Sequence, residues 1–137
     1  MTVHLMREER GMVLGLAIII VVVIGVMAAG LLTFVSADLQ AVVAVNRGEQ
    51  AFQLAEAGIE VAKAHLANHP SPTDWSSGEL RLDGVDDNSV SVTVEHVPGT
   101  FEVVSTGRYG ETKRKIEAVF LLEDGKPRLL GWRELYE

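Results

Sequence analysis

The sequence predicts an α+β protein in which one long N-terminal α-helix, transmembrane in its first part and amphipathic in its second, packs on a small antiparallel β-sheet. Three observations carry this prediction. No charged residue occurs from Gly11 to Ser36. Apolar residues then recur at helical spacing as far as Leu66. From Pro70 onward, turn residues separate segments in which apolar and polar side chains alternate.

The apolar run is long enough to cross a bilayer. At about 1.5 Å of rise per residue, the stretch from Gly11 to Val35 forms roughly 37 Å of helix, which exceeds the ~30 Å hydrocarbon core. Val35-Ser36-Ala37 resembles a secretory cleavage site, but the apolar stretch of a cleaved signal is shorter, about 7 to 15 residues. We therefore expect the run to stay in the protein as a membrane-spanning helix.

The flanking charges predict the orientation of this span. The leader, residues 1–11, carries Arg7 and Arg10, whereas no basic residue follows the apolar run until Arg47. Because basic residues favour the cytoplasmic side, we expect a cytoplasmic N-terminus and an exported remainder. The chain has no cysteine, so the exported part must hold together without a disulfide.

The helix is expected to cover residues 12–68, with 12–36 in the membrane and 37–68 amphipathic. Its second part carries an apolar stripe at steps of three and four: Phe52, Ala55, Ile59, Ala62 and Leu66. Pro70 stops it, because proline has no amide hydrogen and disfavours helical geometry in the residue before it.

Residues 69–137 are expected to form an extracytoplasmic antiparallel sheet. Alternating apolar and polar residues predict strands at 79–82, 90–95, 101–106 and 115–122. Residues 71–78 are expected to be an irregular connection, with Trp75 covering an edge of the core. A sheet with one apolar face needs a cover, and the exported half of the helix is the candidate.

The tail, residues 127–137, is too apolar to be free. We expect it to pair as a last strand or to pack across the sheet. Trp132 and Tyr136 are expected to pack in the core or at its edge, because aromatic side chains bury large areas. The alternative is that these two residues form an adhesive surface.

The junction Arg10-Gly11-Met12 places a single glycine between the charged leader and the apolar helix. This junction resembles the class III signal of type IV pilins and their relatives. The resemblance implies that a dedicated prepilin peptidase cuts between Gly11 and Met12 on the cytoplasmic side and leaves the apolar helix on the mature subunit, with methylation of its new N-terminus.

A second stretch extends the resemblance. The phrase from Arg47 to Glu60 contains Ala55-Glu56-Ala57-Gly58 and is similar to the N-terminal region of PilX-type minor pilins. The match runs from about Arg10 to Leu66. It implies a minor pilin-like structural subunit of a type IV pilus or related filament, in which apolar helices bundle in the core and sheet domains tile the outside.

The resemblance also implies partners and a location. The partners would be other pilin subunits, the prepilin peptidase and the inner-membrane assembly platform. The chain would be a single-pass inner-membrane protein before assembly and part of an extracellular or periplasmic filament afterwards. Most major pilins carry a glutamate as the fifth residue after the cut. Here that position is Leu16, which argues for a minor subunit.

Further residues are candidates for subunit contact. Gly25 and Ala29, four apart, present a small-residue face suited to helix packing, although membrane helices are rich in glycine in any case. Glu56 is either a solvated helix residue or a contact. Gly48 and Gly58 each cost the helix about 1 kcal/mol relative to alanine. Close approach of the sheet or of a neighbouring subunit would offset that cost.

Catalysis and nucleic-acid binding find no support in the sequence. The net charge of -7 disfavours non-specific nucleic-acid binding. The basic stretch Lys113-Arg114-Lys115 is expected to be the solvated rim of a hairpin. No phosphate loop or nucleophile motif occurs, and His65 and His69 lack the companions of a metal site. We expect no cofactor, and we expect the helix dipole to favour the charged form of His65.

Two other functions remain open. One is a tip pseudopilin of a type II secretion system, for which a larger inserted domain is expected. The other is a single-pass membrane-anchored protein with a small extracytoplasmic binding domain. Cleavage after Gly11 separates the anchored protein from the pilin-like subunits.

Overall fold

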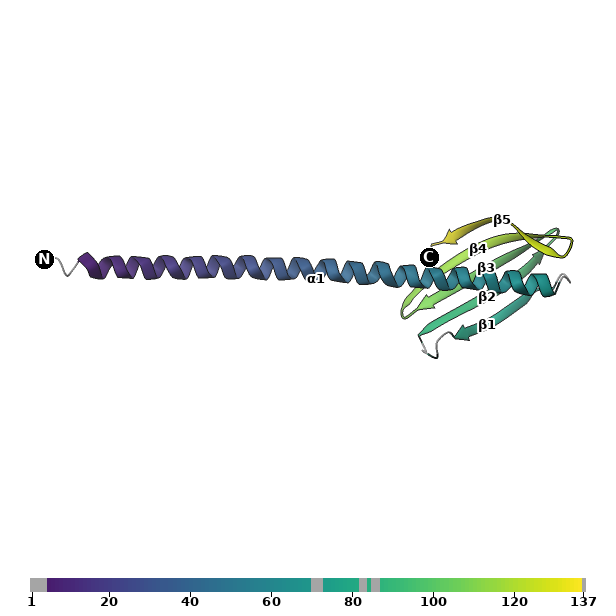
Figure 1. The fold of residues 1–137 in the computed structure, drawn as a ribbon, viewed down its shortest axis with the longest axis horizontal. Helices are drawn as coiled ribbons and strands as arrows, with labels where there is room; N and C mark the ends of the chain where they lie inside the picture. Colours follow the sequence, from purple (N-terminus) through teal and green to yellow (C-terminus); the bar gives the residue numbers. More distant parts are fainter. Residues whose placement is uncertain (1–4, 70–72, 82–83, 85–86, 137) are drawn as a thin grey trace. The chain divides into compact units, whose positions relative to one another are not determined.

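The computed structural model describes residues 5–69, 73–81, 84 and 87–136. The chain divides into two compact units, Met1–Val43 and Ala44–Glu137. The elements, labelled in Figure 1, are one helix and five strands: α1 (Leu5–Asn68), β1 (Trp75–Arg81), β2 (Asn88–Val97), β3 (Thr100–Tyr109), β4 (Thr112–Glu123) and β5 (Lys126–Leu135). This is the α+β arrangement that the sequence predicts.

Helix α1 begins earlier than predicted, at Leu5 instead of Met12. The leader contains Met, Arg and Glu, which are good helix formers, so it continues the helix through Gly11. The predicted end at residue 68 is confirmed.

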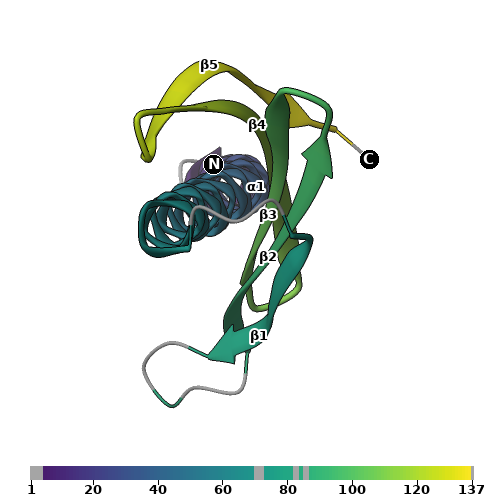
Figure 2. The ribbon, with the colours of Figure 1, turned by 90° about the vertical axis from the view of Figure 1, so that its right-hand side faces the viewer.

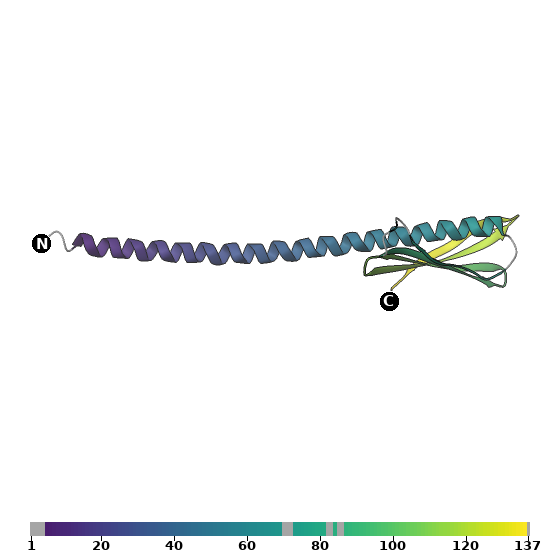
Figure 3. The same ribbon diagram turned by 90° about the horizontal axis from the view of Figure 1, so that it is seen from below.

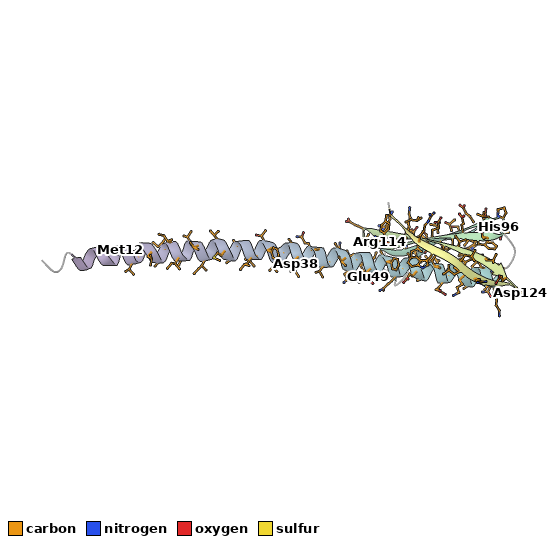
Figure 4. All side chains as sticks on the ribbon, turned by 90° about the horizontal axis from the view of Figure 1, so that it is seen from above. Met12, Asp38, Glu49, His96, Arg114 and Asp124 are labelled. Carbon is orange, nitrogen blue, oxygen red and sulfur yellow. The ribbon has the colours of Figure 1, made fainter. Side chains whose placement is uncertain are left out.

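In the first unit, every side chain from residue 11 to residue 43 is exposed. Figure 4 shows these side chains between Met12 and Asp38. The hydroxyl of Thr33 donates a hydrogen bond of 2.8 Å to the carbonyl oxygen of Ala29, so this polar group is satisfied within the helix. Near the N-terminus, α1 is long and apolar enough to span a membrane.

In the second unit, the five strands form one antiparallel sheet in chain order. Residues 44–68 of α1 cover one face of it, as Figures 2 and 3 show from two directions. The unit boundary therefore falls at Ala44 rather than after residue 68, because the amphipathic part of the helix packs with the strands.

The strand predictions for β2, β3 and β4 are confirmed, including which residues face the helix. Phe101, Val103 and Ser105 are buried, while their neighbours along β3 are half-buried. The prediction for β1 is wrong at its start, because pairing begins at Trp75 and continues past an irregularity between Ser76 and Glu79. Gly78, with φ of 64°, allows that bulge.

The core lies between residues 62–66 of α1 and the helix-facing residues of β2, β3 and β4. Its buried members are Ala62, Leu66, Val90, Val92, Val94, Phe101, Val103, Ala118 and Phe120. The expected cover of the sheet by the helix is thus confirmed, and Trp75 packs at the edge of the core as predicted. Phe52 and Ile59 are only half-buried, whereas Ala51, which the stripe omitted, is fully buried.

Two glycines set how closely α1 approaches the sheet. A Cβ atom on Gly107 would overlap the carbonyl oxygen of Ala51 and the amide nitrogen of Ala55. A Cβ atom on Gly58 would overlap the hydroxyl of Ser105 and lie 2.7 Å from a methyl group of Val90. Gly58 was expected to allow close approach either of the sheet or of a neighbouring subunit. Within this chain it allows close approach of the sheet.

The tail forms β5, which pairs with β4 as an edge strand. This confirms the predicted last strand, but the expected burial of its aromatic residues is wrong: Trp132 is 57% and Tyr136 78% exposed. Five strands about 4.8 Å apart make a sheet roughly 20 Å wide, while one helix is about 10 Å across. One helix therefore leaves β5 uncovered, and the ring of Trp132 lies beside that of Phe52 on α1, at 6.2 Å between ring centroids.

Candidate functional site

The predicted processing junction lies on α1 in the first unit. No heavy atom lies within 4 Å of the position a Gly11 side chain would take, and Met12 is 75% exposed. The helix is continuous through the junction, so a peptidase that binds an extended chain must unwind it there. Glycine makes that unwinding less costly, because it is a weak helix former.

The predicted assembly residues of the first unit lie on the same exposed apolar stretch. Leu16 is 61% exposed, and Gly25 has no neighbour within 4 Å of its missing side chain. Ala29 accepts the Thr33 hydrogen bond through its carbonyl oxygen and is itself exposed. This surface has no protein cover among the described residues of the first unit.

The two predicted assembly residues of the second unit, Glu56 and Gly58, lie in different environments. Gly58 is buried against β2 and β3, whereas Glu56 is exposed. Gly58 is therefore a packing residue within the domain, and Glu56 remains available to a partner. The sequence prediction missed Gly107, which it placed in a connection. The signal was its position two residues after Ser105, on the helix-facing side of the same alternation.

A groove runs beside α1 where the sheet is left uncovered. Its volume is about 400 Å³, and it is lined by Glu56, Ala57, Ile59, Glu60, Ile116, Ala118, Leu129 and Trp132. Glu60 pairs with Lys63 at 3.4 Å, so the acidic edge of the groove is partly neutralised. An apolar floor with an acidic edge suits a protein contact.

A second hollow lies between the first turns of α1 in the second unit and the strands β4 and β5. It is lined by Val45, Gly48, Glu49, Phe52, Arg114, Glu134 and Tyr136. Arg114 pairs with Glu134 at 3.1 Å. Gly48 makes room for this guanidinium, because a Cβ there would lie 3.2 Å from the Nη2 atom of Arg114. The hydroxyl of Tyr136 donates to Glu134 at 2.8 Å, and this hydrogen bond raises the pKa of Tyr136. Arg114 is thus engaged within the fold instead of lying on a solvated hairpin rim.

His65 lies in a stack of three rings at the end of α1. Its ring centroid is 4.0 Å from that of Trp75 and 4.6 Å from that of His69. Burial, and then repulsion from His69, lower the pKa of His65 below its ordinary value. The expectation that the helix dipole would favour its charged form is therefore wrong, because burial and the neighbouring His69 favour the neutral form.

This lowered pKa predicts a pH dependence of stability. Unfolded His65 binds its proton at higher pH than folded His65, so stability is highest above the unfolded pKa of about 6.5 and is lost as the pH falls from there through the lower pKa of folded His65. Denaturant midpoints of a fragment starting at Val45 should fall between about pH 7.5 and about pH 5.5. His65→Phe should reduce the fall, and His96→Gln should not. An unchanged fall in His65→Phe would contradict the assignment.

Among the described residues, no three His, Cys, Asp or Glu side chains gather as a metal ion would require. No protein family, curated protein or solved structure matches this chain.

Proposed function

We propose that this chain is a minor pilin-like structural subunit of a type IV pilus or related filament. The observation that carries the proposal is a combination of two features of one helix. Its apolar stretch is preceded by a charged leader and a single glycine, and its later part covers a sheet in a separate small domain. Such a chain has one part that needs lipid or neighbours and one part that is folded by itself.

The mechanism is packing. Before assembly, the subunit lies in the inner membrane with its N-terminus in the cytoplasm. The exposed apolar side chains between Met12 and Ser36 then contact lipid. After processing, those side chains exchange lipid for the helices of other subunits. The groove beside Glu56 then faces neighbours on the outside of the filament. No chemical step is required of the mature protein.

Processing tests this proposal most directly. In a host with a prepilin peptidase, the intact mass of the membrane-extracted protein should correspond to a chain starting at Met12, with or without one methyl group. Gly11→Leu should block the loss of the leader, because a branched side chain replaces the glycine that the peptidase accepts. Gly15→Leu, four residues on and equally open, is the matched control and should still be processed.

Recovery of only the full-length chain, or of a chain starting at Asp38, would exclude the pilin route. The first outcome would favour a single-pass anchored protein whose domain binds a partner. The groove of about 400 Å³ beside Trp132 is the specific observation in favour of that second function.

Leu16 predicts a scarce subunit. The resemblance to type IV pilins implies that a glutamate at this position would pair with the free amine of an adjacent subunit within an apolar core, where an unpaired charge is costly. With Leu16, the chain has no such carboxylate to offer, so it should polymerise poorly with itself. Quantitative mass spectrometry of purified filaments should find it far below the major subunit. Filaments composed mostly of this chain would contradict the minor role.

A further inference from the structure

A trough lies between α1 and β5, on the side of the sheet that faces the helix. It consists of the two hollows beside α1, which have volumes of about 400 and 440 Å³. Trp132 lines the first and Phe52 lines the second, and these two rings lie beside each other, so the hollows follow one another along α1. Figure 2 looks along α1 and shows β4 and β5 curving around this side of the helix. All residues that line the trough belong to the second unit.

The trough has the dimensions of one further helix. Its lining on α1 extends from Val45 to Glu60, which is about 22 Å of helix or roughly four turns. Because α1 covers about 10 Å of a sheet roughly 20 Å wide, the uncovered strip is about as wide as a helix. Ala57, which also lines the trough, is small enough to let a second helix pack at the usual distance of about 8 to 10 Å between axes. A helix of about 15 residues would therefore fill the trough.

A helix fits this site better than an added β-strand. The register between β4 and β5 shifts at Leu130, which forms a bulge in β5. Pro127, in the same strand, has no amide hydrogen to donate. Bulges and prolines oppose pairing at the edge of a sheet. A partner would therefore cover side chains of β5 instead of extending the backbone ladder, and Leu129 and Trp132 are exposed apolar side chains that line the trough.

The wall of the trough formed by α1 is acidic. Glu49, Glu56 and Glu60 follow one another at steps of seven and four, which places them on one side of the helix, and all three line the trough. Glu60 pairs with Lys63. In the part of the chain that the structure describes, the carboxylates of Glu49 and Glu56 have no ion-pair partner. Both are exposed, so their charges are available to a partner.

The cations near the trough are engaged within the fold. Arg114 pairs with Glu134 in the second hollow. The two arginines of β5 also form ion pairs, with Glu117 and Glu123 of β4. The unpaired charge among the described residues that line the trough is therefore negative, and a helix with basic residues complements it. A second copy of α1 would instead bring its own glutamates against these carboxylates.

We propose that the trough binds an amphipathic helix of another protein, with an apolar face and with Lys or Arg residues along one side. The apolar face covers Leu129 and Trp132, and the basic residues pair with Glu49 and Glu56. Docking of a helix in an apolar groove is a common mode of recognition, and tryptophan is typical of the residues that contribute most to such contacts. The inference names the partner that the proposed function leaves open, and it rests on that function only in assigning the helix to another filament subunit.

Fluorine NMR of the full-length chain tests this proposal. The chain has two tryptophans, so 5-fluorotryptophan gives one signal from Trp132 in the trough and one from Trp75 in β1, at the opposite edge of the sheet. Trp132→Phe assigns the two signals. The chain is placed in phosphatidylcholine nanodiscs, one chain per disc. The probes are two amphipathic helical peptides of about 15 residues with the same leucines, one with lysines on its polar side and one with glutamates.

The lysine peptide should shift the Trp132 signal and leave the Trp75 signal unchanged, and the glutamate peptide should shift neither. Glu56→Lys should weaken binding of the lysine peptide by about fivefold or more, because an attraction between exposed charges becomes a repulsion. Glu95→Lys makes the same charge change at an exposed position of β2 and should leave the affinity unchanged. Adsorption of peptide to the lipid is the same for each variant, and an unchanged Trp75 signal shows that each is folded.

Equal shifts of Trp132 by the two peptides, no shift by either, or equal affinities of the Glu56→Lys and Glu95→Lys variants for the lysine peptide would overturn the proposal. A Trp132 signal that moves when two chains share a disc would also overturn it, because a second copy would then occupy the trough. The discs contain no peptidase, and processing after Gly11 is measured separately, so this proposal and the pilin proposal can each fail alone.

Discussion

Gly107→Ala is expected to destabilise the second unit by about 3 kcal/mol or more, at the upper end of the cost of overpacking a core. The added methyl group meets the backbone of α1 at Ala51 and Ala55 and the Cβ of Leu54, at 2.9 Å. Backbone atoms cannot rotate away as a side chain does, so the helix must move off the sheet. Urea denaturation of the fragment starting at Val45 measures the loss.

Gly131→Ala is the matched control. Gly131 also lies in a strand, but no atom is within 4 Å of its missing side chain. Its substitution should change the free energy of unfolding by no more than about 0.5 kcal/mol. Equal stability of the two variants would show that α1 does not approach β3 as closely as the structure has it.

Ala62→Asp is expected to abolish cooperative unfolding of the same fragment. Ala62 is 0% exposed in the core between α1 and the sheet. A carboxylate there loses its water without gaining a partner, at a cost of several kcal/mol, comparable to the whole stability of a small domain. Val61→Asp introduces the same charge one residue earlier, at a position 38% exposed, and should keep a cooperative melting curve.

A folded Ala62→Asp fragment would contradict the helix-on-sheet core. Phe52 and Ile59, the larger residues of the predicted stripe, are weaker test positions because they are only half-buried. Ile59 lines the groove beside α1 and Phe52 lies beside the exposed Trp132, so an introduced carboxylate at either position retains contact with water.

Some properties of the candidate site residues could be predicted from the sequence, and others could not. The exposure of Leu16 and Gly25 follows from an apolar run with no counterpart in so short a chain. The exposure of Glu56 and the burial of Gly58 do not follow from the residues next to them in the sequence. They lie two residues apart, and about 200° of helical rotation turns one to solvent and the other into the sheet.

By itself, the sequence determined the long helix, its division into an apolar and an amphipathic part, and the helix-facing residues of three strands, because periods of 3.6 and 2 are local properties of the chain. Only the tertiary structure decided that Gly58 and Gly107 let the helix contact the sheet and that Trp132 stays exposed beyond the width of one helix. It also decided the register that places Arg108 of β3 opposite Lys113 of β4. These features depend on the distance between two surfaces and on the register of neighbouring strands, which are set by contacts between residues far apart in the chain.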